Sequence, residues 1–208
     1  MAHGTWQPNP MCNLYNLKAS TRDIGAVFDA LDASGGVLER DYVSPGRPGL
    51  VVTGSAAARQ LRAMRWGFPP PPGVRTAVAN VRKYHSAFWR SALANPERRC
   101  LVPVTSFQEW SVGPDPITGK KKPHWFSVPS RPVFAFAGIW RPVGDEAAFA
   151  FLTTGYEGDP AAHVVGAIHP KAMPVILHDD DHKRWLTAPV EDALGLAAPF
   201  PSQLMAVE

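Results

Sequence analysis

The chain has 208 residues, of which 45% are hydrophobic and 19% charged, and its formal net charge is +3. This length and composition fit one globular domain with a sizeable core and exclude a disordered chain. No stretch approaches about eighteen consecutive apolar residues, which excludes a membrane-spanning helix. A net charge this small favours a polyanionic partner only weakly.

Ten residues, MAHGTWQPNP, precede the stretch MCNLYN. They contain no apolar segment and are not a secretory signal, so we interpret residues 1–10 as a disordered leader or a misassigned start, and residues 11–208 as a single domain. If translation begins at Met11 and this methionine is removed, Cys12 carries a free α-amine beside its thiol. If the leader remains, Cys12 is an ordinary internal cysteine.

Cysteine usage is sparse, because the chain contains Cys12 and Cys100 and no C-x-x-C pair. This pattern predicts neither a disulfide framework nor a cysteine-based zinc site, and it fits a cytoplasmic protein. Cys100 lies in the apolar run RRCLVPV and is interpreted as a small core residue.

One helix is predicted over residues 20–36, with Ser20 or Thr21 as its cap and two glycines at its end. Aromatic and β-branched runs separated by turns predict strands at residues 49–54, 60–68, 75–81, 99–110, 124–128, 132–140 and 149–156. Shorter helices are predicted at residues 86–94 and 179–188, and the tail beyond residue 188 is expected on the surface. Because strands dominate and do not alternate with helices, the predicted class is α+β with a mainly antiparallel, barrel-like sheet.

Glu109 follows an apolar strand and stands between aromatic residues in TSFQEW. Such surroundings desolvate a carboxylate and raise its pKa, which would let Glu109 hold and pass a proton near neutral pH. A strand-end glutamate paired with an arginine is the structural alternative, and residue type alone favours it.

His169 stands between two apolar stretches in GAIHPKAMPVIL. A lone histidine in this setting is more often a core residue with satisfied hydrogen bonds than a catalyst. Its ordinary pKa of ~6.5 nevertheless makes it the natural proton shuttle if a cavity is close.

Asn80 and Arg82 are two positions apart just beyond a predicted strand, so their side chains point the same way. They could anchor a sugar and a phosphate, or they could cap a turn.

The segment RAMRWGFPPPP places Arg62 and Arg65 beside Trp66 and Phe68. Basic residues that flank aromatic ones are typical of surfaces that stack single-stranded nucleic acid. Aromatic residues in strands are usually core residues, so this pattern alone is weak evidence.

Metal and cofactor sites are poorly supported. His178 and His182 have helical i, i+4 spacing, but no third ligand is evident, and a solvated helix start is the favoured interpretation. No phosphate-binding loop, dinucleotide fingerprint or G-x-S-x-G motif is present, so we predict no cofactor and no metal. Residues 120–122 (KKK) are interpreted as a hairpin tip that offers at most a phosphate-facing patch.

Taken together, the segments resemble the SOS-response-associated peptidase (SRAP) family, whose members sense and crosslink abasic sites in DNA. The motifs stand in family order from Met11 to about Leu186: MCNLYN, RWGFPPP, ANVR, RCLVPVTSFQEW, FAFAGIW and IHPKAMPVIL. Each motif alone is unspecific, whereas the ordered set is highly specific.

The resemblance implies that Cys12 is the family's exposed N-terminal cysteine once the initiator methionine is gone. Asn80 matches the asparagine of the family's N-x-R motif, and Arg82 matches its phosphate-contacting arginine. Glu109 and His169 match the catalytic glutamate and histidine of the family.

Trp66 and Phe68 fall where the family places aromatic residues against unstacked DNA, and Arg65 or Lys83 would join Arg82 at the flanking phosphates. The sequence departs from the family at two points. The leader blocks the cysteine amine, and the spacing from the IH motif to its second proline is one residue longer than in some members.

The implied chemistry is coherent. An abasic site in its open form is an aldehyde, and an α-amine has a pKa of ~7.7–8.0, against ~10.4 for lysine, so more of it is nucleophilic at neutral pH. The amine of Cys12 would form an imine, and its thiol would close a thiazolidine ring. Glu109 would move protons, His169 would protonate the sugar O4′ or the departing hydroxyl, and Asn80 would hold the cysteine end or the opened sugar.

The resemblance therefore implies an abasic-site sensor that crosslinks to single-stranded DNA and protects the site during the DNA damage response. Two alternatives remain: a cysteine peptidase that cuts before Cys12 with His169 as base and Glu109 as orienting acid, or a non-covalent binder of single-stranded or modified DNA. We expect a cytoplasmic monomer, associated with the nucleoid when bound to DNA, with no membrane partner.

Overall fold

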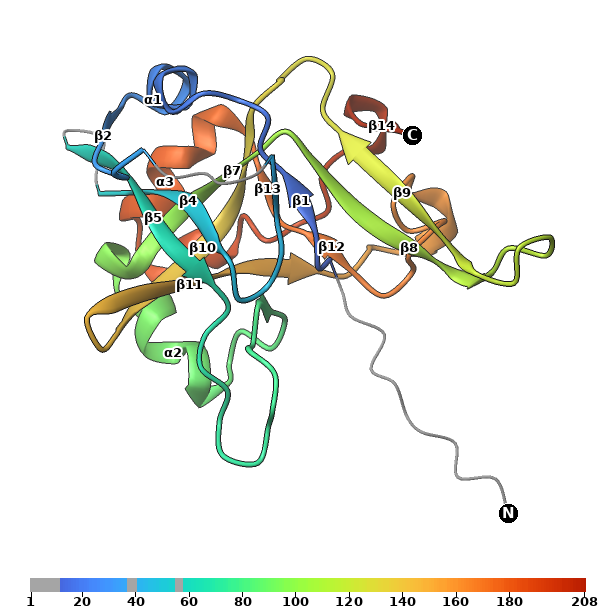
Figure 1. The fold of residues 1–208 in the computed structure, drawn as a ribbon, viewed down its shortest axis with the longest axis horizontal. Coiled ribbons are helices and arrows are strands. Elements are labelled where there is room, and N and C mark those ends of the chain that lie inside the picture. Colours follow the sequence, from blue (N-terminus) through green and yellow to red (C-terminus); the bar gives the residue numbers. More distant parts are fainter. Residues whose placement is uncertain (1–11, 37–40, 55–57) are drawn as a thin grey trace.

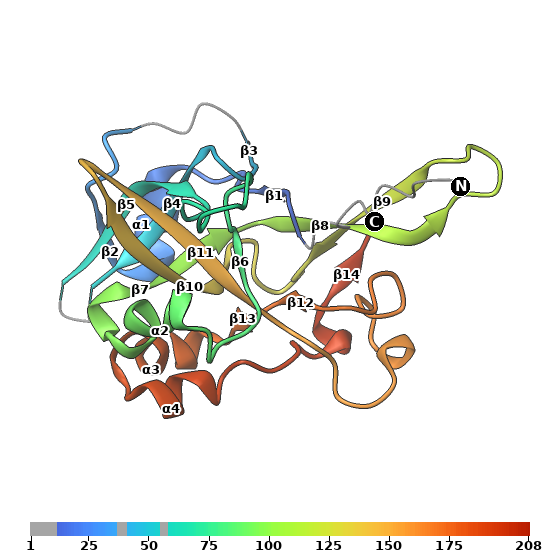
Figure 2. The same ribbon diagram turned by 90° about the horizontal axis from the view of Figure 1, so that it is seen from below.

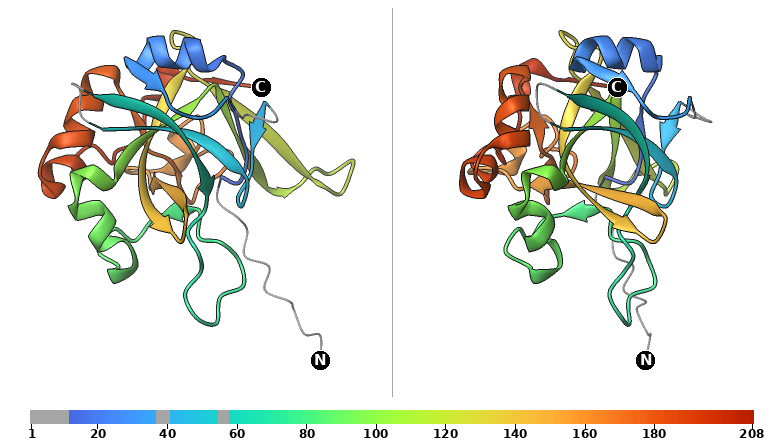
Figure 3. Two further views of the ribbon diagram at one scale, coloured as in Figure 1. Left: turned by 60° about the vertical axis from the view of Figure 1, so that its left-hand side comes forward. Right: turned by 90° about the vertical axis from the view of Figure 1, so that its left-hand side faces the viewer.

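The structure, a computed structural model, describes residues 12–36, 41–54 and 58–208. Its centre is a closed barrel of five strands, visible in Figures 1 and 3. In barrel order the strands are β11 (Glu146–Thr154), β10 (Phe134–Val143), β7 (Arg99–Val104), β4 (Pro48–Thr53) and β5 (Arg59–Trp66). Four contacts between neighbouring strands are antiparallel, and the fifth, between β5 and β11, is parallel and closes the barrel.

Aromatic side chains fill the barrel, because its strands turn alternate residues inward. The ring of Trp66 lies 5.0 Å from that of Phe151, and Phe136 lies 4.8 Å from Phe151 on its other side. Tyr15 adds a fourth ring, 5.2 Å from Trp66. All four residues are fully buried, so the predicted α+β class with a barrel-like sheet is confirmed.

Short strands extend the barrel sheet where the functional segments lie. They are β2 (Ala30–Asp32) beside β5, β6 (Asn80–Val81) and β12 (Met173–Pro174) beside β11, and β13 (Ile176–Leu177) beside β10. The pairing of β6 with β11 carries the segment around Asn80 to the barrel wall.

A second sheet packs beside the barrel. Its order is β14 (Ala206–Val207), β9 (Lys121–Ser127), β8 (Ser106–Pro114), β1 (Tyr15–Asn16) and β3 (Tyr42–Val43). Figure 2 shows the β8–β9 hairpin reaching away from the barrel, while the base of β8 stays against it.

The helices are α1 (Thr21–Phe28), α2 (Ala87–Ala94), α3 (His182–Thr187) and α4 (Val190–Leu194). Single 3-10 turns occupy Pro96–Arg98, Pro160–Ala162, Asp179–Asp181 and Ser202–Leu204. Figure 2 shows α2, α3 and α4 grouped on one side of the barrel. None of the helices in the described residues is long and apolar enough to cross a membrane.

The helix predicted over residues 20–36 is shorter than expected. Ser20 caps it as predicted, but it ends at Phe28 because Asp29 adopts a left-handed conformation with φ of 49°. The next three residues pair with β5, and this pairing supplies hydrogen-bond partners for their backbone groups in place of a further helical turn.

Two other predicted elements also differ. The strand expected at residues 99–110 is two strands in different sheets, β7 and β8, and the strand expected at 75–81 is reduced to β6. The tail beyond residue 188 is not confined to the surface, since Ala193 and Phe200 are buried.

We predict that Gly138→Ala lowers the free energy of unfolding by about 1–3 kcal/mol, because it overpacks the contact between β10 and β7. A Cβ atom at Gly138 would lie 2.8 Å from both Cys100 Sγ and Val102 Cγ2. Urea unfolding measures the change. Gly113→Ala is the matched control, since a Cβ there meets nothing within 4 Å, and equal losses for the two variants would contradict the prediction.

Candidate active site around Cys12

The structure brings Cys12, Asn80, Glu109 and His169 together, although they come from four separate segments. Cys12 precedes β1, Asn80 begins β6, Glu109 lies in β8, and His169 lies in the loop before β12. The antiparallel pairing of β1 with β8 continues as a hydrogen bond from Gln108 N–H to the carbonyl of residue 14, which places Cys12 beside Glu109.

The backbone of Cys12 is held on both sides. Its N–H donates to Glu109 Oε1 at 3.1 Å, and its carbonyl accepts from Asn80 Nδ2 at 3.2 Å. Within the described part of the chain, Asn80 Oδ1 is buried and has no hydrogen-bond partner. The site therefore fixes the α-nitrogen of Cys12 against a carboxyl group and keeps one amide oxygen available as an acceptor.

Glu109 is 1% exposed. Burial raises the pKa of its carboxyl to about 8, and the hydrogen bond from the Cys12 N–H offsets this only in part. Oε2 finds no hydrogen-bond partner among the described residues. At neutral pH the side chain is therefore mostly protonated. Because its pKa is close to the ambient pH, it can give up this proton at a small cost in free energy.

His169 is 2% exposed, and its Nδ1 lies 2.9 Å from the carbonyl oxygen of Ala172. A carbonyl only accepts, so Nδ1 carries the hydrogen, and neutral His169 keeps its lone pair on Nε2. Burial lowers the pKa of His169, and nearby cations lower it further. Nε2 is buried without a partner in the described residues, so it is available as a proton acceptor.

The two groups are close but not hydrogen-bonded to each other. Glu109 Oε2 lies 3.8 Å from His169 Nδ1, beyond hydrogen-bond distance. The Tyr156 hydroxyl donates to the His169 carbonyl at 3.0 Å and so fixes the backbone of the histidine. Glu109 is thus a neutral acid beside His169, a neutral base. Each has one polar atom, Oε2 and Nε2 respectively, without a hydrogen-bond partner in the described residues.

The Cys12 thiol is not activated as in a cysteine peptidase. Burial, and then the charge of Glu109, raises its pKa well above the ordinary value. Its Sγ lies 3.8 Å from the Leu14 carbonyl oxygen, and no hydrogen bond links it to His169 in the described residues. A peptidase nucleophile needs a lowered thiol pKa beside a base, so this geometry does not favour that alternative.

Cationic side chains lie near His169. The positive charges of Lys171, Arg82 and Lys121 all act on His169 and lower its pKa. Arg82 and Lys83 are exposed, as a phosphate-binding role requires. The sequence analysis singled out neither Lys171 nor Tyr156. Lys171 could have been found from its position two residues after His169, whereas no sequence pattern points to Tyr156.

The aromatic residues expected to stack on DNA are elsewhere. Trp66 and Phe68 are fully buried, with the Trp66 indole N–H donating to the Ala79 carbonyl at 3.1 Å. Trp66 belongs to the core because β5 turns it into the barrel, and Phe68, beyond the end of β5, packs on Phe88 and Trp89 of α2. Their interpretation as a stacking surface therefore conflicts with the structure. Arg65 is exposed, but it forms an ion pair with Glu146 at 2.6 Å.

The described residues contain no group of three or more side chains that could hold a metal ion. His178 packs on Phe200 with 4.7 Å between ring centres, while His182 is buried against Phe28. The two histidines therefore make packing contacts at the start of α3.

Comparisons with known proteins relate the whole of this domain to one family. Residues 11–208 match the family described as SOS response associated peptidase (SRAP). The chain is 27% identical over 186 residues to the abasic site processing protein YoaM of Bacillus subtilis (strain 168), covering 85% of this chain and 79% of YoaM. It is 28% identical over 185 residues to the abasic site processing protein YoqW of the same organism, covering 85% and 80%.

Solved structures share the fold. A crystal structure of a Bordetella bronchiseptica protein has a TM-score of 0.74 and 24% identity, covering 94% of this chain and 98% of that protein. One from Bacteroides thetaiotaomicron has a TM-score of 0.75 and 20% identity, covering 94% and 90%. At these identities the similarity concerns the fold alone.

We predict that the Glu109 carboxyl makes stability fall as pH rises from about 4.5 to about 8. Its folded-state pKa of about 8 lies above its ordinary value of 4.5, so the folded state binds one more proton than the unfolded state across this window. One proton corresponds to a slope of up to about 1.4 kcal/mol per pH unit.

Urea unfolding of the unmodified protein and of Glu109→Gln across this window tests the prediction. The free energy of unfolding of the unmodified protein minus that of Glu109→Gln should fall as pH rises, because the amide does not titrate. Glu157→Gln, at an exposed position, is the control and should leave the pH profile unchanged. Parallel profiles for the protein and Glu109→Gln would show that this carboxyl has an ordinary pKa.

Proposed function

The chain belongs to the SOS response associated peptidase (SRAP) family, and we propose that it processes abasic sites by bonding covalently to them through Cys12. The substrate is single-stranded DNA that contains an abasic site, and the product is a thiazolidine between the abasic sugar and the cysteine. The relatives named as abasic site processing proteins support this substrate class.

The position of the Cys12 nitrogen carries the proposal. This nitrogen lies 3.1 Å from Glu109 Oε1, a carboxyl with a pKa of about 8. In a chain that begins at Cys12 the same atom is an α-amine, and Glu109 stands where it can take a proton from that amine. In an internal cysteine the same contact would serve only as a hydrogen bond for a buried backbone N–H.

The first step opens the abasic sugar, a cyclic hemiacetal. His169 Nε2 takes the proton of the 1′-hydroxyl while Glu109 gives its proton to O4′, the C1′–O4′ bond breaks, and C1′ becomes an aldehyde. The protonation states favour this direction, because His169 is neutral with a free lone pair and Glu109 is protonated. With these protonation states the proton donor to O4′ is Glu109 and not His169.

The second step forms the imine. The amine of Cys12 attacks C1′ and passes a proton to the Glu109 carboxylate, while protonated His169 returns its proton to the aldehyde oxygen. Glu109 then protonates the new hydroxyl group, which leaves as water, and an iminium remains.

The third step closes the ring. The Cys12 sulfur bonds to the iminium carbon, and the thiol proton goes to Glu109, which restores the starting state of both side chains. Net, one water molecule is lost. Because amine and thiol belong to one residue, ring closure is intramolecular and has a high effective concentration.

The surrounding residues would hold the DNA. Asn80 keeps the carbonyl of Cys12 in place through Nδ2 and offers its free Oδ1 to a sugar hydroxyl. Arg82 and Lys83 are exposed close to the site and would bind the flanking phosphates. Their charge suits a polyanionic strand on this side of the barrel.

The leader, residues 1–10, and Met11 lie outside the described residues. The proposed chemistry requires that Cys12 be the first residue of the reactive protein, either because translation starts at Met11 or because the leader is cut off. We favour a start at Met11, because MAHGTWQPNP has no feature that the site could use.

We predict that protein beginning at Met11 forms a heat-stable adduct with an abasic single-stranded oligonucleotide, whereas Cys12→Ala forms none. Cys12→Ser keeps the amine but lacks the thiol, so it should give a reversible imine that survives denaturation only after borohydride reduction. Denaturing gels and intact mass report the adduct, whose mass should equal that of protein plus DNA less one water.

Cys100→Ala is the matched control, since Cys100 is the chain's other cysteine and is buried in β7. It should crosslink like the unmodified protein. A protein that begins at Met1 and keeps its leader should not react. If Cys12→Ala still formed the adduct, or if no protein did, the proposed function would be wrong.

We further predict that Glu109→Gln and His169→Gln each slow adduct formation by about 10²- to 10⁴-fold, the usual contribution of a positioned acid or base. Single-turnover rates at saturating oligonucleotide measure this loss. The controls are Glu157→Gln, at an exposed position, and His178→Gln, whose ring packs on Phe200 with 4.7 Å between ring centres.

An acyclic aldehyde analogue separates the two roles. It needs no ring opening, so the defect of His169→Gln should shrink on it while that of Glu109→Gln persists. Equal defects on both substrates would show that His169 does not act in ring opening.

A further inference from the structure

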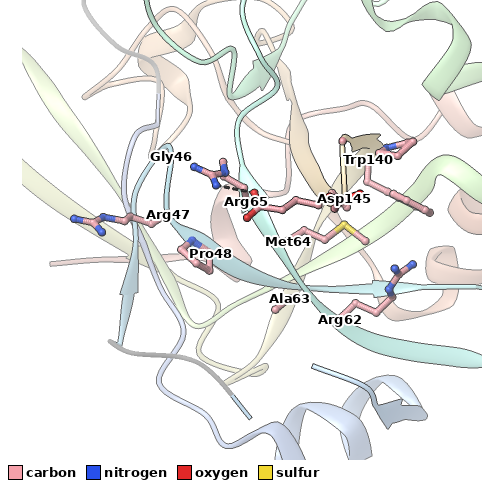
Figure 4. A pocket seen from close by; sticks show the side chains of 13 residues that line it. Gly46, Arg47, Pro48, Arg62, Ala63, Met64, Arg65, Trp140 and Asp145 are labelled. Carbon is pink, nitrogen blue, oxygen red and sulfur yellow. Dashed lines mark hydrogen bonds and ion pairs between the residues drawn. The ribbon is translucent and has the colours of Figure 1, made fainter. Parts of the chain in front are cut away.

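A hollow with a basic wall lies on the outside of the barrel (Figure 4). Its volume is about 660 Å³. It lies between β4, β5 and the turn that joins β10 to β11. The side chains that give it its chemistry are Arg47, Arg62, Arg65, Trp140, Asp145 and Glu146.

The charges of the hollow favour an anion. Arg65 forms an ion pair with Glu146 at 2.6 Å. Of the other charged side chains that line the hollow, Arg47 and Arg62 are positive and Asp145 is negative, so positive charge is in excess. In Figure 4, Arg47 and Arg62 lie toward opposite ends of the hollow, with Arg65 between them. An extended ligand with repeated negative charges would match this arrangement better than a compact anion.

One wall of the hollow is aromatic. The guanidinium carbon of Arg62 lies 5.2 Å from the centre of a Trp140 ring, and that of Arg98 lies 4.5 Å from it. These cation–π contacts hold the arginines against the indole and form a flat cationic surface. Flat aromatic and guanidinium surfaces are what nucleic-acid bases stack on.

Strand pairing places the hollow near the candidate active site. β5 and β6 pair with the same edge of β11: Arg65 of β5 is opposite Ala148, and Asn80 of β6 is opposite Phe151. Three residues along a strand span about 10 Å, so the backbone of Arg65 lies about that far from the backbone of Asn80. Three positions is an odd number, so the Arg65 side chain lies on the outer face of the barrel wall and the Asn80 side chain on its inner face. A DNA strand held at Asn80 would therefore pass over the edge of this wall to reach the hollow.

We propose that this hollow is a second DNA subsite, which binds the phosphodiester backbone and a base of the strand on one side of the abasic nucleotide. The inference rests on the proposed function for its substrate. Arg47 and Arg62 bind phosphates, because guanidinium groups match phosphate oxygens in geometry and charge. The Trp140–Arg62 surface stacks a base.

Because the hollow lies to one side of Asn80 along β11, it binds one flank of the strand and not both. The subsite adds affinity for DNA without touching the reacting sugar. It therefore acts on the concentration of DNA needed for reaction and leaves the rate at saturation unchanged.

The test uses protein that begins at Met11 and three abasic oligonucleotides. One carries a single nucleotide on each side of the abasic site, and the others are extended by several nucleotides toward either the 5′ or the 3′ end. For each, the half-saturating concentration and the maximal rate of crosslinking are measured with unmodified protein, Arg47→Glu and Arg62→Gln.

We expect both variants to raise the half-saturating concentration about tenfold for one extended oligonucleotide, with no change for the other two and an unchanged maximal rate. For that oligonucleotide, Arg62→Gln should also reduce the slope of log affinity against log salt concentration by about 0.7, the value for one phosphate contact on a single strand. Arg22→Glu, a charge reversal on α1 outside the hollow, is the control for general electrostatics.

Two outcomes would overturn the subsite: unchanged affinities on both extended oligonucleotides, or equal losses on all three, which would reflect a general field. Failure of the proposed function looks different, since the unmodified protein would then crosslink none of the oligonucleotides. Arg47 is exposed, so its variant is expected to fold, and thermal unfolding of both variants verifies this.

Discussion

The hydrogen bond between the Cys12 nitrogen and Glu109 is the contact on which the candidate site depends. It joins residues 97 positions apart, and it forms because β1 pairs with β8 in a register that brings the two side by side. The surrounding burial does two things at once. It holds the nitrogen in place, and it raises the pKa of the carboxyl to about 8, so that Glu109 can both give and take a proton near neutrality.

Barrel closure supplies the rest of the site. The parallel pairing of β5 with β11 closes the wall, and β6 adds to the same edge of β11, which brings Asn80 to the Cys12 carbonyl. The loop before β12 returns to β11 and delivers His169. The barrel wall thus positions Asn80 and His169, while the pairing of β1 with β8 in the second sheet positions Cys12 and Glu109.

The ionisation of the site follows from the burial of both groups, because desolvation disfavours the charged form of each. Burial, and then nearby cations, lowers the pKa of His169 and keeps it neutral against the opposing effect of its Nδ1 hydrogen bond to the Ala172 carbonyl, while desolvation keeps Glu109 protonated. An acid and a base that are both uncharged cost less to bury than an ion pair. The same cations that keep His169 neutral form the side on which a DNA strand would arrive.

The sequence alone was enough to predict the barrel-like α+β class and most strand positions, and its ordered motifs singled out the four residues that the structure brings together at the candidate site, because hydrophobic patterns and motifs are local properties. It did not determine the early end of α1 at Phe28, the burial of Trp66 or the basic hollow beside Trp140. Nor could it show which nitrogen of His169 is free. Burial, hydrogen-bond partners and pKa values depend on contacts between distant segments, and only the closed tertiary structure decides those.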